Sequence, residues 1–183
     1  GNTDHRILAI NYTWNYSTYD PQTFTSDYRG RTTLDGGTLQ LGANYGFGGS
    51  TVYLNAGRLS SDSTTGRSFG NAMVIGADML LGSATKTGAM YSGGAVSLGG
   101  GTRILTTDSD FYFSGIISNG GLTKAGAAML TLTGANTYAG PTTLNAGWLR
   151  IGNAVNTGVS TALGTSAVTL NGGRLSTNTY VDI

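Results

Sequence analysis

The feature that most constrains this fold is a short corner that recurs along the chain. Two apolar residues five positions apart flank a turn of small and polar residues, as do Leu144 and Leu149 around Asn145-Ala146-Gly147. In an unbroken strand, residues five apart point to opposite faces, so both side chains can enter one core only if the chain bends between them. Asn and Gly tolerate the positive φ that such a bend needs. The sequence therefore predicts a repeating unit of strand, corner and strand.

The corner occurs seven times, and its starting positions differ by 20, 21, 23, 19, 27 and 26 residues. In the fourth copy the turn is one residue longer. We expect both apolar residues of each pair to point inward. The pairs are Leu34 and Leu39, Leu54 and Leu59, Ile75 and Leu80, Leu98 and Ile104, Ile117 and Leu122, Leu144 and Leu149, and Leu170 and Leu175.

A unit of this size cannot bury its apolar face alone, so successive units must stack. Antiparallel hairpins would give a turn signal every 8 to 12 residues, whereas this corner returns only after a whole unit. With Gly at 31 of 183 residues, long helices are disfavoured. We predict an all-β parallel β-solenoid of roughly seven to eight coils of about 20–27 residues, with loops at 60–70, 85–94 and 153–167.

Residues 1–32 differ from the coils predicted for 33–183, because aromatic side chains alternate with polar ones there. Flat rings of this kind stack on sugars, which makes this strip a candidate ligand-binding site. The alternative is that the rings cover an open end of the array as an atypical terminal coil or cap, or pack on residues beyond this sequence. The candidate ligand-binding residues are Tyr12, Trp14, Tyr16 and Tyr19.

Composition argues against several classes of function. Ten basic and nine acidic residues give a net charge of +1, so no nucleic-acid-binding surface is expected. The chain has no cysteine, which excludes disulfides and thiolate metal sites, and no cofactor is expected. No apolar run is long enough to span a membrane. The first ten residues do not resemble a signal peptide, so we expect any export signal to lie outside this sequence.

Two stretches could suggest catalysis. Gly164-Thr165-Ser166-Ala167 resembles the serine motif of subtilisin-like proteases, but the chain has one histidine, His5, in a terminal segment. Asp108 and Asp110 could supply carboxylates for calcium or for acid–base chemistry, yet such a pair more often forms a solvated turn. We therefore expect no catalytic residues and no metal site.

The stretch from Gly120 to Ile151 resembles the passenger-associated transport repeat of bacterial autotransporters. That repeat has a Gly-Gly-Leu-x-Lys-x-Gly start, a Leu-Thr-Leu strand, an Asn-Thr-Tyr turn and a Gly-Thr-Leu end, and the strong likeness covers about 115–175. Pro141 and Trp148 depart from the usual small or polar residues. Among the matching residues we assign to the repeat and to export Gly120, Gly121, Leu122, Lys124, Gly126, Leu130, Leu132, Asn136, Tyr138 and Gly147.

The resemblance implies a right-handed parallel β-helix that is threaded outward through a C-terminal β-barrel translocator absent from this sequence. It also implies a fragment of a longer passenger, at the bacterial cell surface or secreted. We predict a non-enzymatic stalk with adhesive or self-associating surfaces, for which a host receptor or a glycan is the expected partner. The alternatives are a secreted carbohydrate-active β-helix enzyme and a solenoid like a phage tail spike.

Overall fold

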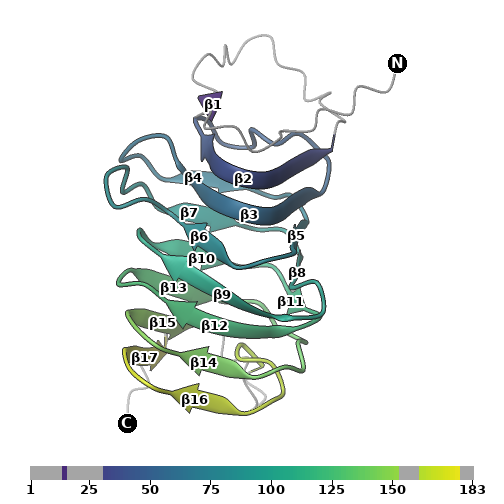
Figure 1. The fold of residues 1–183 in the computed structure, drawn as a ribbon, viewed down its shortest axis with the longest axis vertical. Coiled ribbons are helices and arrows are strands. Elements are labelled where there is room, and N and C mark those ends of the chain that lie inside the picture. The colour runs from purple at the N-terminus through teal and green to yellow at the C-terminus, as the bar shows by residue number, and fades with distance from the viewer. Residues whose placement is uncertain (1–13, 16–30, 153–160, 178–183) are drawn as a thin grey trace.

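The chain winds into a right-handed parallel β-solenoid. The computed structural model describes residues 14–15, 31–152 and 161–177, and in these residues every strand pairs in parallel and no helix occurs. In Figure 1 the chain crosses the front from right to left, passes behind on the left and returns on the right as it descends. Since the described residues form no helix, none of them forms a membrane-spanning helix.

An 11-stranded sheet forms two sides of the solenoid. Its strands are β1 (Trp14–Asn15), β2 (Thr32–Leu41), β3 (Val52–Ser61), β5 (Met73–Ile75), β6 (Met79–Leu81), β8 (Val96–Ser97), β9 (Thr102–Thr107), β11 (Ile117–Ser118), β12 (Gly121–Ala125), β14 (Thr142–Leu144) and β16 (Val168–Leu170). The long strand β3 bends at its corner, so its first half pairs with β5 and its second half with β6.

A 6-stranded sheet, which we call the back sheet, forms the remaining side. Its strands are β4 (Arg67–Phe69), β7 (Met90–Ser92), β10 (Phe111–Phe113), β13 (Met129–Leu132), β15 (Trp148–Ile151) and β17 (Arg174–Thr177). Strands β4 and β7 lie within 60–70 and 85–94, which the sequence predicted to be loops. Each strand has only three residues beside a polar turn, so its hydrophobic pattern is too short to stand out.

The core is a set of ladders in which inward side chains from successive coils stack along the axis. Met90, Phe111, Leu130 and Leu149 occupy matching positions on four neighbouring strands of the back sheet, and all four are fully buried. Burying each such side chain contributes about 1.5–3 kcal/mol. The inward placement predicted for Leu130 and Leu132 is confirmed.

Of the predicted corner residues, two point outward, and a third, in register with the buried Leu144, lies at the end of its sheet. Leu80 and Ile104 are 39% and 40% exposed, whereas the next residue in each case, Leu81 or Leu105, is fully buried. The turns before Leu81 and Leu105 are therefore one residue longer than predicted. Leu170 is 58% exposed because β16 ends its sheet within the described residues, so nothing described stacks on its outer side.

The seven corners lie on two different edges of the solenoid, although the sequence suggested one. Leu144 pairs with Lys124, and Leu149 pairs with Leu130, so the Asn145-Ala146-Gly147 turn stacks on the turn after β12. The preceding corner in the sequence, between Ile117 and Leu122, lies on the neighbouring edge. The interval of 27 residues therefore contains more than one coil, and the structure has about six turns, not seven to eight.

A charge placed in the core at Leu132 should destabilise the fold. We expect Leu132→Asp to lower the free energy of unfolding by about 3–5 kcal/mol, because the carboxylate would be buried without a partner. Urea unfolding followed by circular dichroism measures this change. Thr137→Asp places the same charge at an exposed position and should leave the midpoint nearly unchanged. Equal midpoints for both variants would show that Leu132 does not lie in the core.

Candidate functional site

The most unusual side chain in the transport-like stretch is a buried lysine. Lys124 is 0% exposed, and its neighbours in register are Leu105 on β9 and Leu144 on β14. Its Nζ atom donates hydrogen bonds to the carbonyl oxygens of Ala125 at 2.7 Å, Gly126 at 2.8 Å and Ala146 at 3.1 Å. The ammonium therefore joins the turn of its own coil to the turn of the next one.

The local sequence explains why a lysine can occupy this place. Alternation from Leu122 puts Lys124 on the inward face of β12, where its apolar stem packs in line with leucines above and below. The chain then turns at Gly126, whose φ is +79°. The carbonyl oxygens of Ala125 and Gly126 at this turn, and of Ala146 in the turn of the next coil, accept the three donors of the ammonium.

Burial lowers the pKa of the Lys124 ammonium from 10.5 to about 8. Desolvation is the main cause, because a buried charge loses its hydration, and the negative charge of Asp110 acts in the opposite direction. In the unfolded chain the lysine regains its ordinary pKa. Lys124 therefore links stability to pH between about 8 and 10.5.

Asn136 connects three successive coils. Its side chain is buried, and its Oδ1 atom accepts a hydrogen bond from the backbone N–H of Ile117 at 2.8 Å. Its Nδ2 atom donates to the carbonyl oxygen of Ala162 at 2.6 Å. Since Ile117 lies one coil before Asn136 and Ala162 one coil after it, this amide replaces strand pairing at a turn.

Tyr138 fills the core beside that amide. The buried Tyr138 hydroxyl lies 2.8 Å from Thr142 Oγ1, which donates to the carbonyl oxygen of Leu163 at 3.0 Å. Burial raises the pKa of the Tyr138 phenol, whereas its bond to Thr142 lowers it. The ring also packs against Gly164, where an added Cβ would collide with it.

Gly147 permits the turns of two coils to lie in contact. Its φ is +70°, and a Cβ added there would collide with the carbonyl oxygen of Gly126 and lie 2.8 Å from Lys124 Nζ. Only glycine combines this conformation with such a close approach. Gly147 and Lys124 are therefore parts of one packed corner.

The two aspartates of the catalytic alternative have separate structural partners. Asp108 forms an ion pair with Arg58 at 2.7 Å, and Asp110 accepts a hydrogen bond from the backbone N–H of Met129 at 3.0 Å. Among the described residues no group of three or more His, Cys, Asp or Glu side chains could hold a metal ion. Both carboxylates support the turn between β9 and β10.

Most of the remaining candidates lie outside the described residues. Trp14 lies in β1, whose backbone pairs with β2 opposite Leu39, while Tyr12, Tyr16 and Tyr19 lie outside the described residues. His5, which a protease reading of Ser166 would need, also lies outside them. The predicted aromatic strip therefore stays a prediction.

The sequence predicts Lys124 and Asn136 as repeat residues but does not predict their bonding partners. A signal was present, because alternation from Leu122 places Lys124 at an inward position. The partners Ala146 and Ala162 lie 22 and 26 residues further along and carry no distinctive side chain. Their role comes from backbone carbonyls, which the sequence pattern does not distinguish.

Comparison with protein families gives one match. The model described as Passenger-associated-transport-repeat matches residues 22–41 and 122–151. The second segment contains the Lys124 corner, Asn136 and Tyr138, and the first includes all of β2. No curated protein and no solved structure matches the chain. The resemblance predicted for 115–175 is therefore confirmed by the match over 122–151, and a second match falls earlier in the chain, at 22–41.

Lys124 should make stability depend on pH. Because its folded pKa of about 8 lies below its unfolded value, only the unfolded chain holds this proton between about pH 8 and 10.5, so raising the pH favours the native state. We expect the stability of the natural chain, relative to Lys124→Met, to rise by up to about 2 kcal/mol from pH 8 to 10. Urea unfolding at several pH values measures this difference.

Tyr138 and the other titrating groups are present in both proteins, so their effects cancel in that difference. At neutral pH Lys124→Met should also be less stable by about 1–3 kcal/mol, because three carbonyl oxygens lose their donor. Parallel pH profiles for the two proteins would contradict the coupling.

Gly147 allows a direct test of the corner packing. We expect Gly147→Ala to lower the free energy of unfolding by at least about 2 kcal/mol, through backbone strain and the collision with Gly126. Gly70→Ala is the matched control, because a Cβ at Gly70 meets no atom within 4 Å. A melting temperature that falls equally in both variants would show that the effect is not specific to the corner.

Proposed function

This chain carries the passenger-associated-transport-repeats of autotransporter passengers, and we propose that it is a non-enzymatic β-solenoid stalk. In this proposal a C-terminal β-barrel translocator exports the stalk, which remains at the bacterial surface or is secreted. There it presents surfaces for adhesion, either to a host receptor or glycan or to other copies of itself.

One observation carries the proposal. The polar side chains of the matched repeat, Lys124, Asn136 and Tyr138, are all buried, and all bond within the solenoid. Residues used in this way stabilise successive coils and leave the outer surface to other side chains. A stretch that folds coil by coil after leaving a pore would hold the exported chain outside.

The partners of Asp108 and Asp110 support the non-enzymatic part of the proposal. Each carboxylate has a structural partner in the described chain. Asp108 is paired with Arg58, and Asp110 orients the start of β13. No described contact favours the carbohydrate-active enzyme or the tail-spike alternative.

Surface display tests the export role. The complete 183-residue chain is placed between an export signal and a β-barrel translocator, and antibody labelling of intact cells is compared with total protein. We expect Lys124→Met and Leu132→Asp to lower the labelled fraction several-fold, because the coils at this end would fold less stably. Thr137→Asp should display normally.

Normal display of both destabilised variants would contradict the proposed link between coil stability and export. Adhesion or aggregation of the displaying cells, compared with cells bearing the translocator alone, tests the surface role. Polysaccharide cleavage that disappears in Asp108→Asn with Asp110→Asn would contradict the non-enzymatic assignment.

A further inference from the structure

Aromatic and arginine side chains gather on the outer face of the back sheet. Tyr91 on β7 and Tyr112 on β10 are in register, and their rings stack with centroids 4.6 Å apart at an interplanar angle of 16°. Tyr91 is 45% exposed. The next two residues along this row are Thr131 and Arg150. The row therefore runs from two stacked phenols to a guanidinium group.

A second row lies beside the first. Trp148 and Arg150 alternate with the buried Leu149 on β15, so both project from the outer face. Trp148 is 48% exposed, and the guanidinium of Arg174 lies over it, 4.9 Å from the ring centroid. We call Tyr91, Tyr112, Trp148, Arg150 and Arg174 the aromatic–arginine face.

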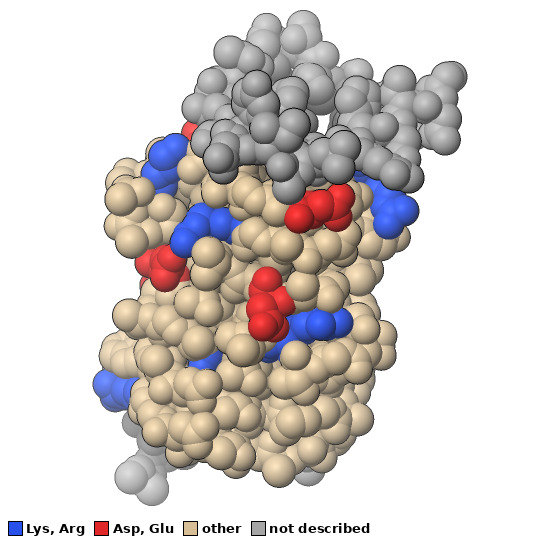
Figure 2. All heavy atoms as spheres, viewed as in Figure 1, with Lys and Arg blue, Asp and Glu red and all other residues tan. Residues whose placement is uncertain are grey.

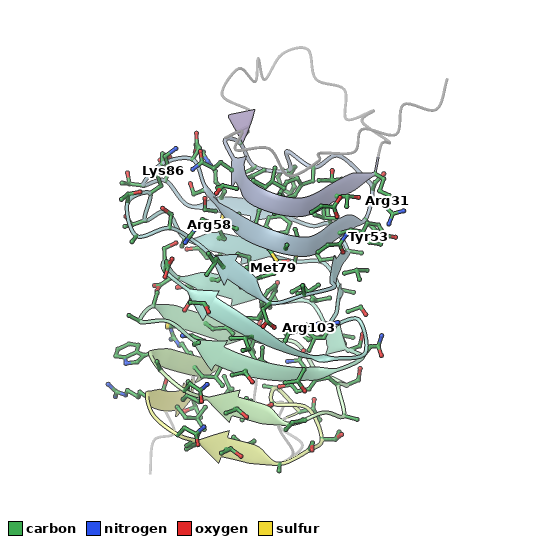
Figure 3. All side chains as sticks on the ribbon, in the orientation of Figure 1. Arg31, Tyr53, Arg58, Met79, Lys86 and Arg103 are labelled. Carbon is green, nitrogen blue, oxygen red and sulfur yellow. The ribbon has the colours of Figure 1, made fainter. Side chains whose placement is uncertain are left out.

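The charge of this part of the chain has one sign. No acidic residue occurs between Asp110 and Asp182, whereas Lys124, Arg150 and Arg174 fall in that interval. Lys124 is buried against carbonyl oxygens, so the outward charge of these coils comes from the two arginines. The opposite side differs, since acidic and basic groups lie next to one another in the upper coils of Figure 2. Arg58 lies on that side in Figure 3, and it pairs with Asp108.

We propose that the aromatic–arginine face binds an acidic glycan, a polysaccharide whose sugars carry carboxylate groups. Tyr91 and Trp148 are each nearly half exposed, and the ring surface that Tyr112 and Arg174 leave uncovered offers apolar contact to the C–H groups of the sugars. The arginine forks bind carboxylates through paired hydrogen bonds, and their charge complements that of the polymer. The proposal rests on the adhesive function proposed above and names its ligand class.

The composition of the face favours a glycan over a protein partner. Protein interfaces have a contiguous apolar centre. Here Thr131 separates Tyr112 from Arg150, and Ser176 follows Arg150 in the same row. Thr131 is buried, so the accessible row passes from the tyrosine rings to a guanidinium and then to Ser176, and the rings do not join into one contiguous apolar centre.

Titration calorimetry of the complete chain with polygalacturonate tests the proposal. We expect binding that weakens at least about tenfold in Trp148→Thr and in Arg150→Gln, because one variant removes the exposed ring and the other a carboxylate partner. The methyl ester of the same polymer, which has no free carboxylates, should bind at least about tenfold more weakly to the natural chain.

Arg103→Gln is the matched control. It also removes one positive charge, but from β9 in the other sheet, where the Nε atom of Arg103 donates to the carbonyl oxygen of Leu98 at 2.9 Å. Binding by this variant should be nearly unchanged. If Trp148→Thr alters the melting temperature, the substitution Tyr91→Ser, at another exposed ring, is used instead to test ring stacking.

Three results would overturn the inference: no binding to polygalacturonate, equal binding of the polymer and its ester, or equal loss in Arg103→Gln and Arg150→Gln. A concentration-dependent dimer that Trp148→Thr abolishes would instead assign the face to a second copy of this chain. Cells that adhere normally while displaying Trp148→Thr would overturn the glycan site and leave the proposed adhesive function intact.

Discussion

Hydrogen bonding between successive coils is the constraint on which this structure depends. In a parallel stack, each strand finds its backbone partners only in the coils directly before and after it. Turns keep this pairing only in part: the Gly140 N–H still donates to the Gly120 carbonyl of the coil before, whereas other turn groups bond to side chains. Lys124 and Asn136 supply the missing donors and acceptors at two such turns. The buried polar side chains of the transport repeat thus form hydrogen bonds to backbone groups at these turns.

Much of the fold could be predicted, because a corner with inward residues on both sides requires a bent, stacked chain. The limits of the prediction are also physical. Leu80 and Leu81 are both apolar, so the sequence could not tell which one faces the core. The two edges that carry the corners use the same kinds of residues, and this similarity hid the change of edge between Ile117 and Leu144. The number of coils was overestimated for that reason.

The candidate site was predicted less completely than the fold. Alternation places Lys124 and Leu132 inward, but it does not reveal which atoms an inward ammonium meets. The answer depends on Ala146, a residue of the next coil that acts through its backbone alone. The aromatic–arginine face was missed for a related reason. Tyr91, Tyr112 and Trp148 are scattered in the sequence, and only the register of the back sheet brings them to one face.

The orientation of the bonds between coils has a mechanical consequence. Because these bonds run along the axis of the solenoid, a force that pulls its two ends apart loads the coils in series, and the weakest contact opens first. The bonds of Lys124 and Asn136 cross the contacts between the coils that contain β11, β12, β14 and β16. Under such a force these side-chain bonds would share the load with strand pairing at those contacts, so the coils of the matched repeat would resist separation through side chains as well as through the backbone.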